Sequence, residues 1–283
     1  MSAGLADPSN ELREVRGPYS FGNDRQRFFT LVWLLARSDF KLRYAGSFLG
    51  PLWGLLRPIA IFSVLYVVFT HIVRFGDDIE YYAQLLLFNI MLFTFFVDGT
   101  TTALRSLVRN QRIVSKTQFP RAALPLAAVL THGFNLGFNF LVVLGFFVFT
   151  GVPIRWTWLL IPVVIALLVI LTVCVSAFLA ALYAQFRDIE QLWSGVITRV
   201  LFYASPILYP LEFVPESFRD IVLLNPLAPL LVESRTWLID PNAPGVEAAS
   251  GGAIALSLSL FVLTCFVGVA VFVRTAPRVA ESL

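Results

Sequence analysis

Long apolar blocks, interrupted by short charged segments, make up most of this chain of 283 residues. Six of the blocks approach the roughly 20 residues that an α-helix needs to cross the hydrocarbon core of a bilayer. A block such as F-L-V-V-L-G-F-F-V-F shows none of the alternation between apolar and polar residues that marks a transmembrane β-strand, so we expect helices. The predicted spans are Leu52–Ile72, Ala83–Leu104, Ala122–Thr150, Thr157–Ala184, Gln191–Tyr209 and Ala253–Val273.

The segment 23–44 mixes aromatic and aliphatic residues with charges, and it is too short and too charged to cross a bilayer. An amphipathic helix lying in the headgroup region would bury the aromatic rings and expose the cations. Asp39 and Arg43 are one helical turn apart, which allows them to pair on the exposed face. We therefore predict an interface helix within residues 23–50, for which membrane anchoring is the simplest role. The charged residues of its second half are Arg37, Asp39, Lys41 and Arg43.

Two short amphipathic runs precede the last predicted span. They cover Glu216–Leu224 and Leu227–Trp237, are separated by Asn225 and Pro226, and are too short to cross a bilayer. Such helices are able to dip back into a membrane where protein or water covers their ends. An ordinary external loop is the alternative, although it would expose many apolar residues to water. We predict re-entrant helices within 211–237. Prolines at 206, 210, 215, 226 and 229 break the helix repeatedly from the end of the fifth span to the end of this segment.

The composition agrees with an all-α integral membrane protein of six transmembrane helices. Hydrophobic residues make up 58% of the chain and charged residues only 14%, which departs from ordinary soluble usage. Cys174 and Cys265 lie singly inside apolar blocks, where a small buried hydrophobe is the expected role. No metal site is expected, because no pair of histidines has metal-ligand spacing.

The basic residues predict the orientation. If the N-terminus lies inside, 17 of the 21 Lys and Arg residues fall on cytoplasmic segments, as the positive-inside rule requires. Both termini are then cytoplasmic, with an irregular arm at 1–22 and a short tail at 274–283. The net charge of +3 reflects this topology, and nucleic acid is not an expected partner. A multi-pass protein of the plasma membrane is the predicted location.

Two charged segments lie between predicted spans on the cytoplasmic side. The loop 105–121 carries five cations and no acid, which either fixes topology or contacts anionic lipid. A tighter turn carries Arg187, Asp188 and Glu190. Asp98 lies near the inner end of the second span, where a carboxylate at the bilayer centre would cost about 2.5–3.5 kcal/mol. We expect it to face protein or water, with Arg105 as its partner.

The chain carries none of the motifs of a nucleotide-hydrolysing enzyme. It has no G-x-x-x-x-G-K-[ST] loop to cradle phosphates and no nucleophile elbow. The chain is therefore predicted not to be an enzyme. If it transports a substrate uphill, the energy must come from another polypeptide.

Several motifs, in order along the chain, resemble those of ABC-2 type export permeases, above all the permease half of O-antigen and teichoic-acid type polysaccharide exporters. The entrance motif of that family is similar to Arg37, Asp39, Lys41, Arg43 and Tyr44, followed by Ser47, Leu49, Gly50, Trp53 and Pro58. The stretch I-V-S-K-T-Q-F-P-R, followed by L-P, resembles the first cytoplasmic loop of the family, and R-D-I its second turn. The segments P-I-L-Y-P and L-N-P-L resemble its outer gate.

The resemblance implies a homodimer that works with two copies of an ABC ATPase subunit, which binds the ATP and magnesium. The implied cargo is a lipid-linked polysaccharide, and the other partner is membrane lipid. The implied entrance residues are Arg37, Asp39, Lys41, Arg43, Tyr44 and Trp53. The implied ATPase contacts are Arg109, Arg112, Lys116, Arg121, Arg187, Asp188 and Glu190. The implied outer gate includes Pro206, Tyr209, Pro210, Asn225 and Pro226, and candidate aromatics along the cargo path are Tyr66, Phe134, Phe138 and Tyr203.

Three alternatives stay open from the sequence. Another branch of ABC-2 exporters moves drugs or lipids. A secondary transporter would place ionisable residues near the bilayer midplane, and Asp98 is the only acid within a predicted span. A membrane-embedded glycosyltransferase or flippase would show carboxylates facing a cavity. Within the polysaccharide branch, the overall pattern also resembles the galactan exporters of arabinogalactan-type cell walls.

Overall fold

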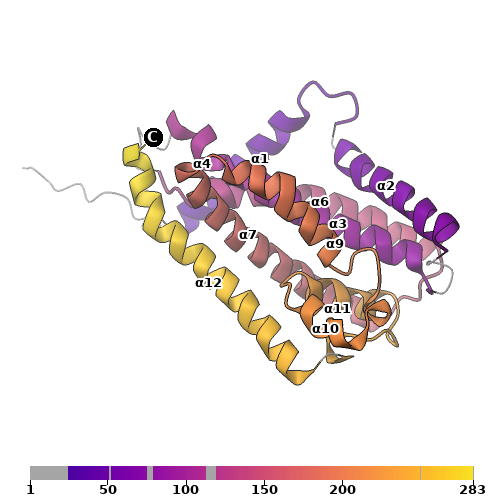
Figure 1. Cartoon of the computed structure of the whole chain (residues 1–283). Coiled ribbons are helices and arrows are strands. Elements are labelled where there is room, and N and C mark those ends of the chain that lie inside the picture. Colours follow the sequence, from indigo (N-terminus) through magenta and orange to yellow (C-terminus); the bar gives the residue numbers. More distant parts are fainter. Residues whose placement is uncertain (1–24, 51, 75–78, 113–118, 249, 283) are drawn as a thin grey trace, which may run out of the picture.

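The computed structural model describes residues 25–50, 52–74, 79–112, 119–248 and 250–282, and this part of the chain is helical without strands, as predicted. The predicted arm at 1–22 lies outside the described residues. The longer helices are α1 (Arg25–Tyr44), α2 (Leu52–Val67), α3 (Tyr82–Leu104), α6 (Ala123–Phe149), α7 (Ile161–Gln185) and α12 (Gly251–Ser282) (Figure 1). The shorter elements are η1 (Val68–Ile72), α4 (Ser106–Arg109), η3 (Trp156–Leu160), α8 (Ile189–Gln191), η4 (Leu192–Ile197), α9 (Thr198–Ala204), η5 (Leu211–Phe213), α10 (Glu216–Leu223), α11 (Ala228–Leu238) and η6 (Val246–Ala248).

Five helical segments of the described chain are long and apolar enough to cross a membrane. They match five of the predicted spans to within a few residues and cover Leu52–Ile72, Tyr82–Leu104, Ala123–Phe149, Trp156–Gln185 and Gly251–Ala276. The other predicted span, Gln191–Tyr209, is shorter in the structure. Its helix runs from α8 through the π-helical η4 to Ala204, and the backbone becomes extended at Ser205. Pro206 follows, and a proline cannot donate the hydrogen bond that would continue a helix.

The bundle is built around α3. The apolar residues of α3 surround the whole helix, and 72% of its most apolar window is buried. Its main partners are α6 and α7, and Phe88, Leu92 and Phe147 are among the fully buried side chains. In contrast, only 6% of the corresponding window of α2 is buried, and α2 stands at the edge of the bundle (Figure 1). Most of the apolar surface of α2 is therefore available to lipid or to another protein.

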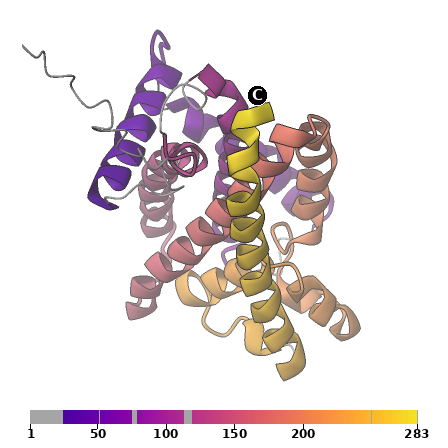
Figure 2. The same ribbon diagram turned by 90° about the vertical axis from the view of Figure 1, so that its left-hand side faces the viewer.

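Helix α12 packs along α7 on the opposite side of the bundle (Figures 1 and 2). The two backbones approach closely at Gly268, where a Cβ atom would lie 2.3 Å from the carbonyl oxygen of Cys174. Only glycine fits at this crossing. Cys174 is buried and Cys265 is partly buried, and both are free cysteines.

Helix α1 packs on α6 through one face. Phe28, Val32 and Ala36 recur every four residues, so they lie on one side of the helix, where they are buried against Ala123 and Ala127. Phe29, Trp33 and Leu42 are exposed. The helix covers Arg25–Tyr44 of the predicted segment 23–50 and ends before the turn that leads into α2.

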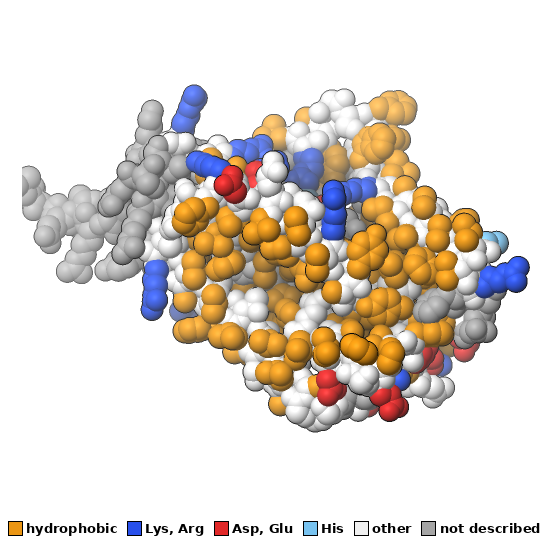
Figure 3. Space-filling view, viewed as in Figure 1, with side chains coloured by type: hydrophobic (Ala, Val, Ile, Leu, Met, Phe, Trp, Pro, Cys, Tyr) orange, Lys and Arg blue, Asp and Glu red, His pale blue; other side chains and the backbone are white. Residues whose placement is uncertain are grey.

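The two ends of the bundle differ in charge. The end that we call the terminal end holds α4, α8, the start of α1 and the end of α12 (Figure 1). The distal end holds η3, α10 and α11, and Trp158 of η3 donates a hydrogen bond to the carbonyl of Leu238. On the face drawn in Figure 3, apolar side chains cover the middle, and Lys and Arg lie mainly toward the terminal end.

Candidate functional site

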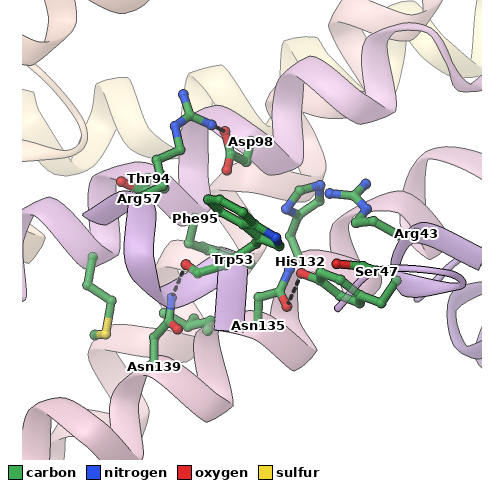
Figure 4. Close-up of a pocket in the computed structure, with 14 residues that line it drawn as sticks. Arg43, Ser47, Trp53, Arg57, Thr94, Phe95, Asp98, His132, Asn135 and Asn139 are labelled. Atoms are coloured by element: carbon green, nitrogen blue, oxygen red, sulfur yellow. Dashed lines mark hydrogen bonds and ion pairs between the residues drawn. The ribbon is translucent and has the colours of Figure 1, made fainter. Parts of the chain in front are cut away.

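A polar pocket of about 300 Å³ opens where the end of α1 meets α2, α3 and α6 (Figure 4). It lies in an otherwise apolar part of the bundle, so its polar side chains are conspicuous. They come from the adjoining helices α1 and α2 and from α3 and α6, which follow later in the sequence. We call this the entrance pocket, and its polar and aromatic lining includes Arg43, Tyr44, Ser47, Trp53, Arg57, Asp98, His132, Asn135 and Asn139.

Hydrogen bonds between helices hold the shape of the entrance pocket. The Tyr44 hydroxyl donates to Asn135 Oδ1 at 2.9 Å, and Asn139 Nδ2 donates to the carbonyl of Gly54 at 3.1 Å. Gly54 permits this approach, because a Cβ atom there would lie 3.2 Å from the Tyr44 hydroxyl and 3.3 Å from Asn135 Oδ1. The start of α2 is therefore fixed to α6 and to the end of α1.

An ion pair connects α2 to α3 in the same pocket. Arg57 Nη1 lies 2.9 Å from Asp98 Oδ1, and the side chains are 62% and 27% exposed. The prediction that Asp98 pairs with Arg105 is wrong. Two helical turns separate these residues by about 10 Å along α3, whereas α2 crosses beside Asp98. Arg105 instead pairs with Glu190.

The pocket is suited to hold an anionic group that also carries hydroxyls. Arg43 and Arg57 supply guanidinium groups, which bind phosphate or carboxylate through paired N–H donors. Trp53 adds an aromatic face. His132 is buried and its Nε2 lies 2.9 Å from Thr102 Oγ1. The described residues contain no cluster of His, Cys, Asp or Glu that could hold a metal ion.

The predicted entrance residues divide into two groups. Arg43, Tyr44 and Trp53 line the pocket, whereas Arg37, Asp39 and Lys41 are exposed on α1 and do not. Among the described residues, Asp39 forms no ion pair with Arg43. Arg57 is the residue that the sequence reasoning missed. The sequence does contain a signal for it: Arg57 lies inside an apolar span, and the next span contains one acid. Charges inside a membrane tend to pair with one another.

The predicted ATPase contacts gather at the terminal end. Arg109 lies in α4, and Arg112 follows it. Lys116 lies outside the described residues. Arg121 donates a hydrogen bond to the carbonyl of Ala276 in α12, and Arg187 lies over the Tyr183 ring at 5.0 Å. Asp188 precedes α8, and Glu190 lies within it and pairs with Arg105. The Arg105–Glu190 pair thus joins the end of α3 to α8.

The predicted gate residues form a connected turn. Asn225 Nδ2 donates to Ser205 Oγ at 2.7 Å, and Asn89 Nδ2 of α3 donates to the Pro206 carbonyl at 3.1 Å. Tyr209 donates to the carbonyl of Tyr203. Pro210 is buried and precedes η5, and Pro226 follows Asn225 before α11. The helices α10 and α11 follow the two predicted amphipathic runs to within a residue.

The four candidate path aromatics do not form one row. Phe134 packs edge-on against Trp33 and Phe40, under α1. Tyr66 stacks on Phe62 at 5.6 Å between ring centroids, and Phe138 is 41% exposed. Tyr203 is 66% exposed and lines a different pocket.

That second pocket has a volume of about 310 Å³ and lies between α2, α3 and α9. It shares Arg57, Thr94 and Asp98 with the entrance pocket. We call it the α9 pocket. Its other lining residues include Ile61, Phe93, Thr198, Arg199, Phe202 and Tyr203.

Comparison with known proteins agrees with the resemblance seen in the sequence. The model of a family described as ABC-2 type transporter matches residues 30–236, which include every residue that lines the entrance pocket. Two proteins of Klebsiella pneumoniae, each named O-antigen export system permease protein RfbA, are 31% and 30% identical to the chain, over 90% of its length and 95% of theirs. A protein of the same name from Myxococcus xanthus is 29% identical over 75% of the chain and 82% of its own length.

Proposed function

The chain belongs to the ABC-2 type transporter family, and from this premise we propose that it is the permease subunit of an ABC exporter of lipid-linked polysaccharide. The similarity to O-antigen export permeases runs over nearly the whole of both chains, which supports a transport subunit and not an enzyme. The entrance pocket is the observation that carries the proposal for the cargo. It joins two arginines, amide groups and an indole ring at the α1–α2 junction.

The proposed cargo fits this pocket better than an apolar drug does. A lipid-linked polysaccharide carries phosphate between its lipid and its sugars, and Arg43 and Arg57 offer the cations for such a group. The Asn135 and Asn139 amides and the Trp53 ring suit the sugar next to the phosphate. An exporter of drugs or lipids is the alternative, and a galactan is one polymer consistent with the sequence resemblance.

We propose that the terminal end is cytoplasmic and that the membrane is the plasma membrane. The basic residues support this orientation, since they concentrate at the terminal end (Figure 3). The helix from Ile189 to Ala204 would provide a sixth, shorter crossing. Helices α10 and α11 would be re-entrant at the outer side. The burial of Leu230, Leu231 and Leu238 of α11 against the rest of the bundle supports this placement.

A second copy of the chain and two copies of an ABC ATPase complete the proposed exporter. The exposed apolar residues of α2 and α9 support a dimer contact there, with Val64 and Val200 each more than half exposed. The ATPase would dock at the terminal end, on α4 and α8, and would supply ATP hydrolysis. Tyr66, Phe138 and Tyr203 would then contact the passing sugars.

Deletion of the gene in its host tests the proposed function. We expect the surface polysaccharide to disappear while carrier-linked polymer accumulates inside the cell, and we expect the chain to restore export only together with its ATPase. Radiolabelled sugar in the extracted lipid and surface fractions provides the measurement. If the deletion leaves surface polymer unchanged and instead increases sensitivity to a drug, the drug exporter is the correct function.

A further inference from the structure

The Arg57–Asp98 ion pair lies between the two pockets of the permease. Arg57 and Asp98 line the entrance pocket on one side and the α9 pocket on the other. Because Figure 4 shows the Arg57 guanidinium extending toward Asp98, the pair bridges α2 and α3 where the two pockets meet. The pair is therefore part of the lining that the two pockets share.

Each of the two pockets contains a further arginine near the pair. Arg43 lies with Arg57 in the entrance pocket, so an anion that enters there meets two guanidinium groups. Arg199 lies with Asp98 in the α9 pocket, and its side chain is exposed. Among the described residues, Arg199 forms no ion pair, and Arg57 forms an ion pair only with Asp98. Asp98 thus pairs with Arg57, shares the entrance pocket with Arg43 and shares the α9 pocket with Arg199.

From this arrangement we infer that the diphosphate of the cargo displaces Asp98 from Arg57, and that Asp98 then pairs with Arg199. The inference rests on the proposed function and names the group that the entrance pocket recognises. A diphosphate ester has two phosphate groups for the two arginines, and each guanidinium is able to bind phosphate in a bidentate manner. Pairing with Arg199 avoids leaving the Asp98 carboxylate without a cation, which would be costly in this environment.

The displacement would also loosen α2. Little of α2 is buried, although Ile59, Phe62 and Leu65 pack partly on the core. Among the described residues, its polar connections to other helices are the Arg57–Asp98 pair and the hydrogen bond from Asn139 to the Gly54 carbonyl. Once the pair opens, one polar connection remains, at the start of the helix. Binding of the diphosphate would thereby join the entrance pocket to the α9 pocket.

Calorimetric titration of the purified full chain in detergent with farnesyl diphosphate tests the inference. Asp98→Asn removes the anion that competes with the probe for Arg57. If Arg57 is unpaired in about a tenth of the wild-type molecules, Asp98→Asn should bind farnesyl diphosphate about tenfold more tightly. Arg57→Gln should weaken binding by a similar factor. Arg199→Gln should weaken binding in the wild-type background and have no effect in the Asp98→Asn background.

The double variant Arg57→Asp with Asp98→Arg exchanges the two charges. It distinguishes binding of the anion by Arg57 from stabilisation of α2 by the ion pair. It should restore the thermal stability of an ion pair without restoring affinity for farnesyl diphosphate. Recovery of affinity in the swap, or unchanged affinity in Asp98→Asn, would show that the pair only braces α2 and would overturn the inference.

Two further probes identify the source of the anion. Inorganic pyrophosphate should bind more weakly than farnesyl diphosphate but show the same response to Asp98→Asn. Phosphatidylglycerol, which has one phosphate, should not show that response. If Asp98→Asn raises the affinity for phosphatidylglycerol by the same factor, the pocket binds any lipid phosphate and the diphosphate assignment is wrong. The gene deletion tests the proposed function separately, because its result depends on polymer export and not on the role of Asp98.

Discussion

The carboxylate of Glu190, in α8, forms an ion pair with the guanidinium of Arg105, the residue between α3 and α4. The two residues belong to the two charged segments that the sequence places on the cytoplasmic side. One pair therefore connects both of the proposed ATPase contacts. It also connects them to α3, which carries Asp98 and Asn89 and so reaches both the entrance pocket and the gate turn.

The Arg105–Glu190 pair is expected to matter more for transport than for stability. The side chains are 54% and 27% exposed, so Glu190→Gln should change the free energy of unfolding by less than about 1 kcal/mol. We expect it to reduce ATP-dependent export several-fold, because α3 and α8 would no longer move together. The swap Arg105→Glu with Glu190→Arg should recover export. Full export by Glu190→Gln alone would contradict this role.

The cations after α4 should bind the ATPase. Arg109 lies in α4 and Arg112 follows it, at the terminal end. Replacement of both by glutamate should abolish copurification of the ATPase subunit with the tagged permease, since the contact would change from attraction to repulsion. Arg74→Glu, which changes an exposed arginine near the end of η1, is the matched control and should retain the ATPase. If the double variant also retains it, these arginines serve only to fix topology.

The gate turn should depend on Asn89. Its side chain is fully buried and donates to the Pro206 carbonyl. Asn89→Leu leaves this buried carbonyl without its donor, which should cost about 1–3 kcal/mol. Thermal unfolding in detergent measures the loss, and export should fall as the turn loosens. Asn242→Ala, in an exposed loop, is the control. Equal melting temperatures for both variants would show that Asn89 does not hold the turn.

Gly268 should be essential for the packing of α12 on α7. A methyl group at this position would lie 2.3 Å from the Cys174 carbonyl, so Gly268→Ala must push the helices apart. We expect a loss of about 1–3 kcal/mol, which is typical of overpacking. Gly251→Ala in the same helix meets nothing within 4 Å and should be neutral or slightly stabilising. A Gly268→Ala variant as stable as the wild type would contradict the close approach.

Five apolar crossings and the two short helices near the distal end were predictable from the sequence, because their limits depend on local properties. The length of an apolar block reflects the thickness of a bilayer, and prolines mark where helices break. Leu52–Ile72 was therefore predicted to the residue, and α11 to within one residue at each end. The resemblance to a family of exporters was recognisable for the same reason, because its motifs are short local segments of the sequence.

Tertiary structure alone decided which side chains meet. Asp98 pairs with Arg57 and not with Arg105, and Phe134 lies under α1 and not on an open path. Such contacts depend on how each helix is rotated and where it crosses its neighbour. Those quantities follow from packing between distant segments, as at Gly268 and Cys174, and the periodicity of a single helix does not contain them.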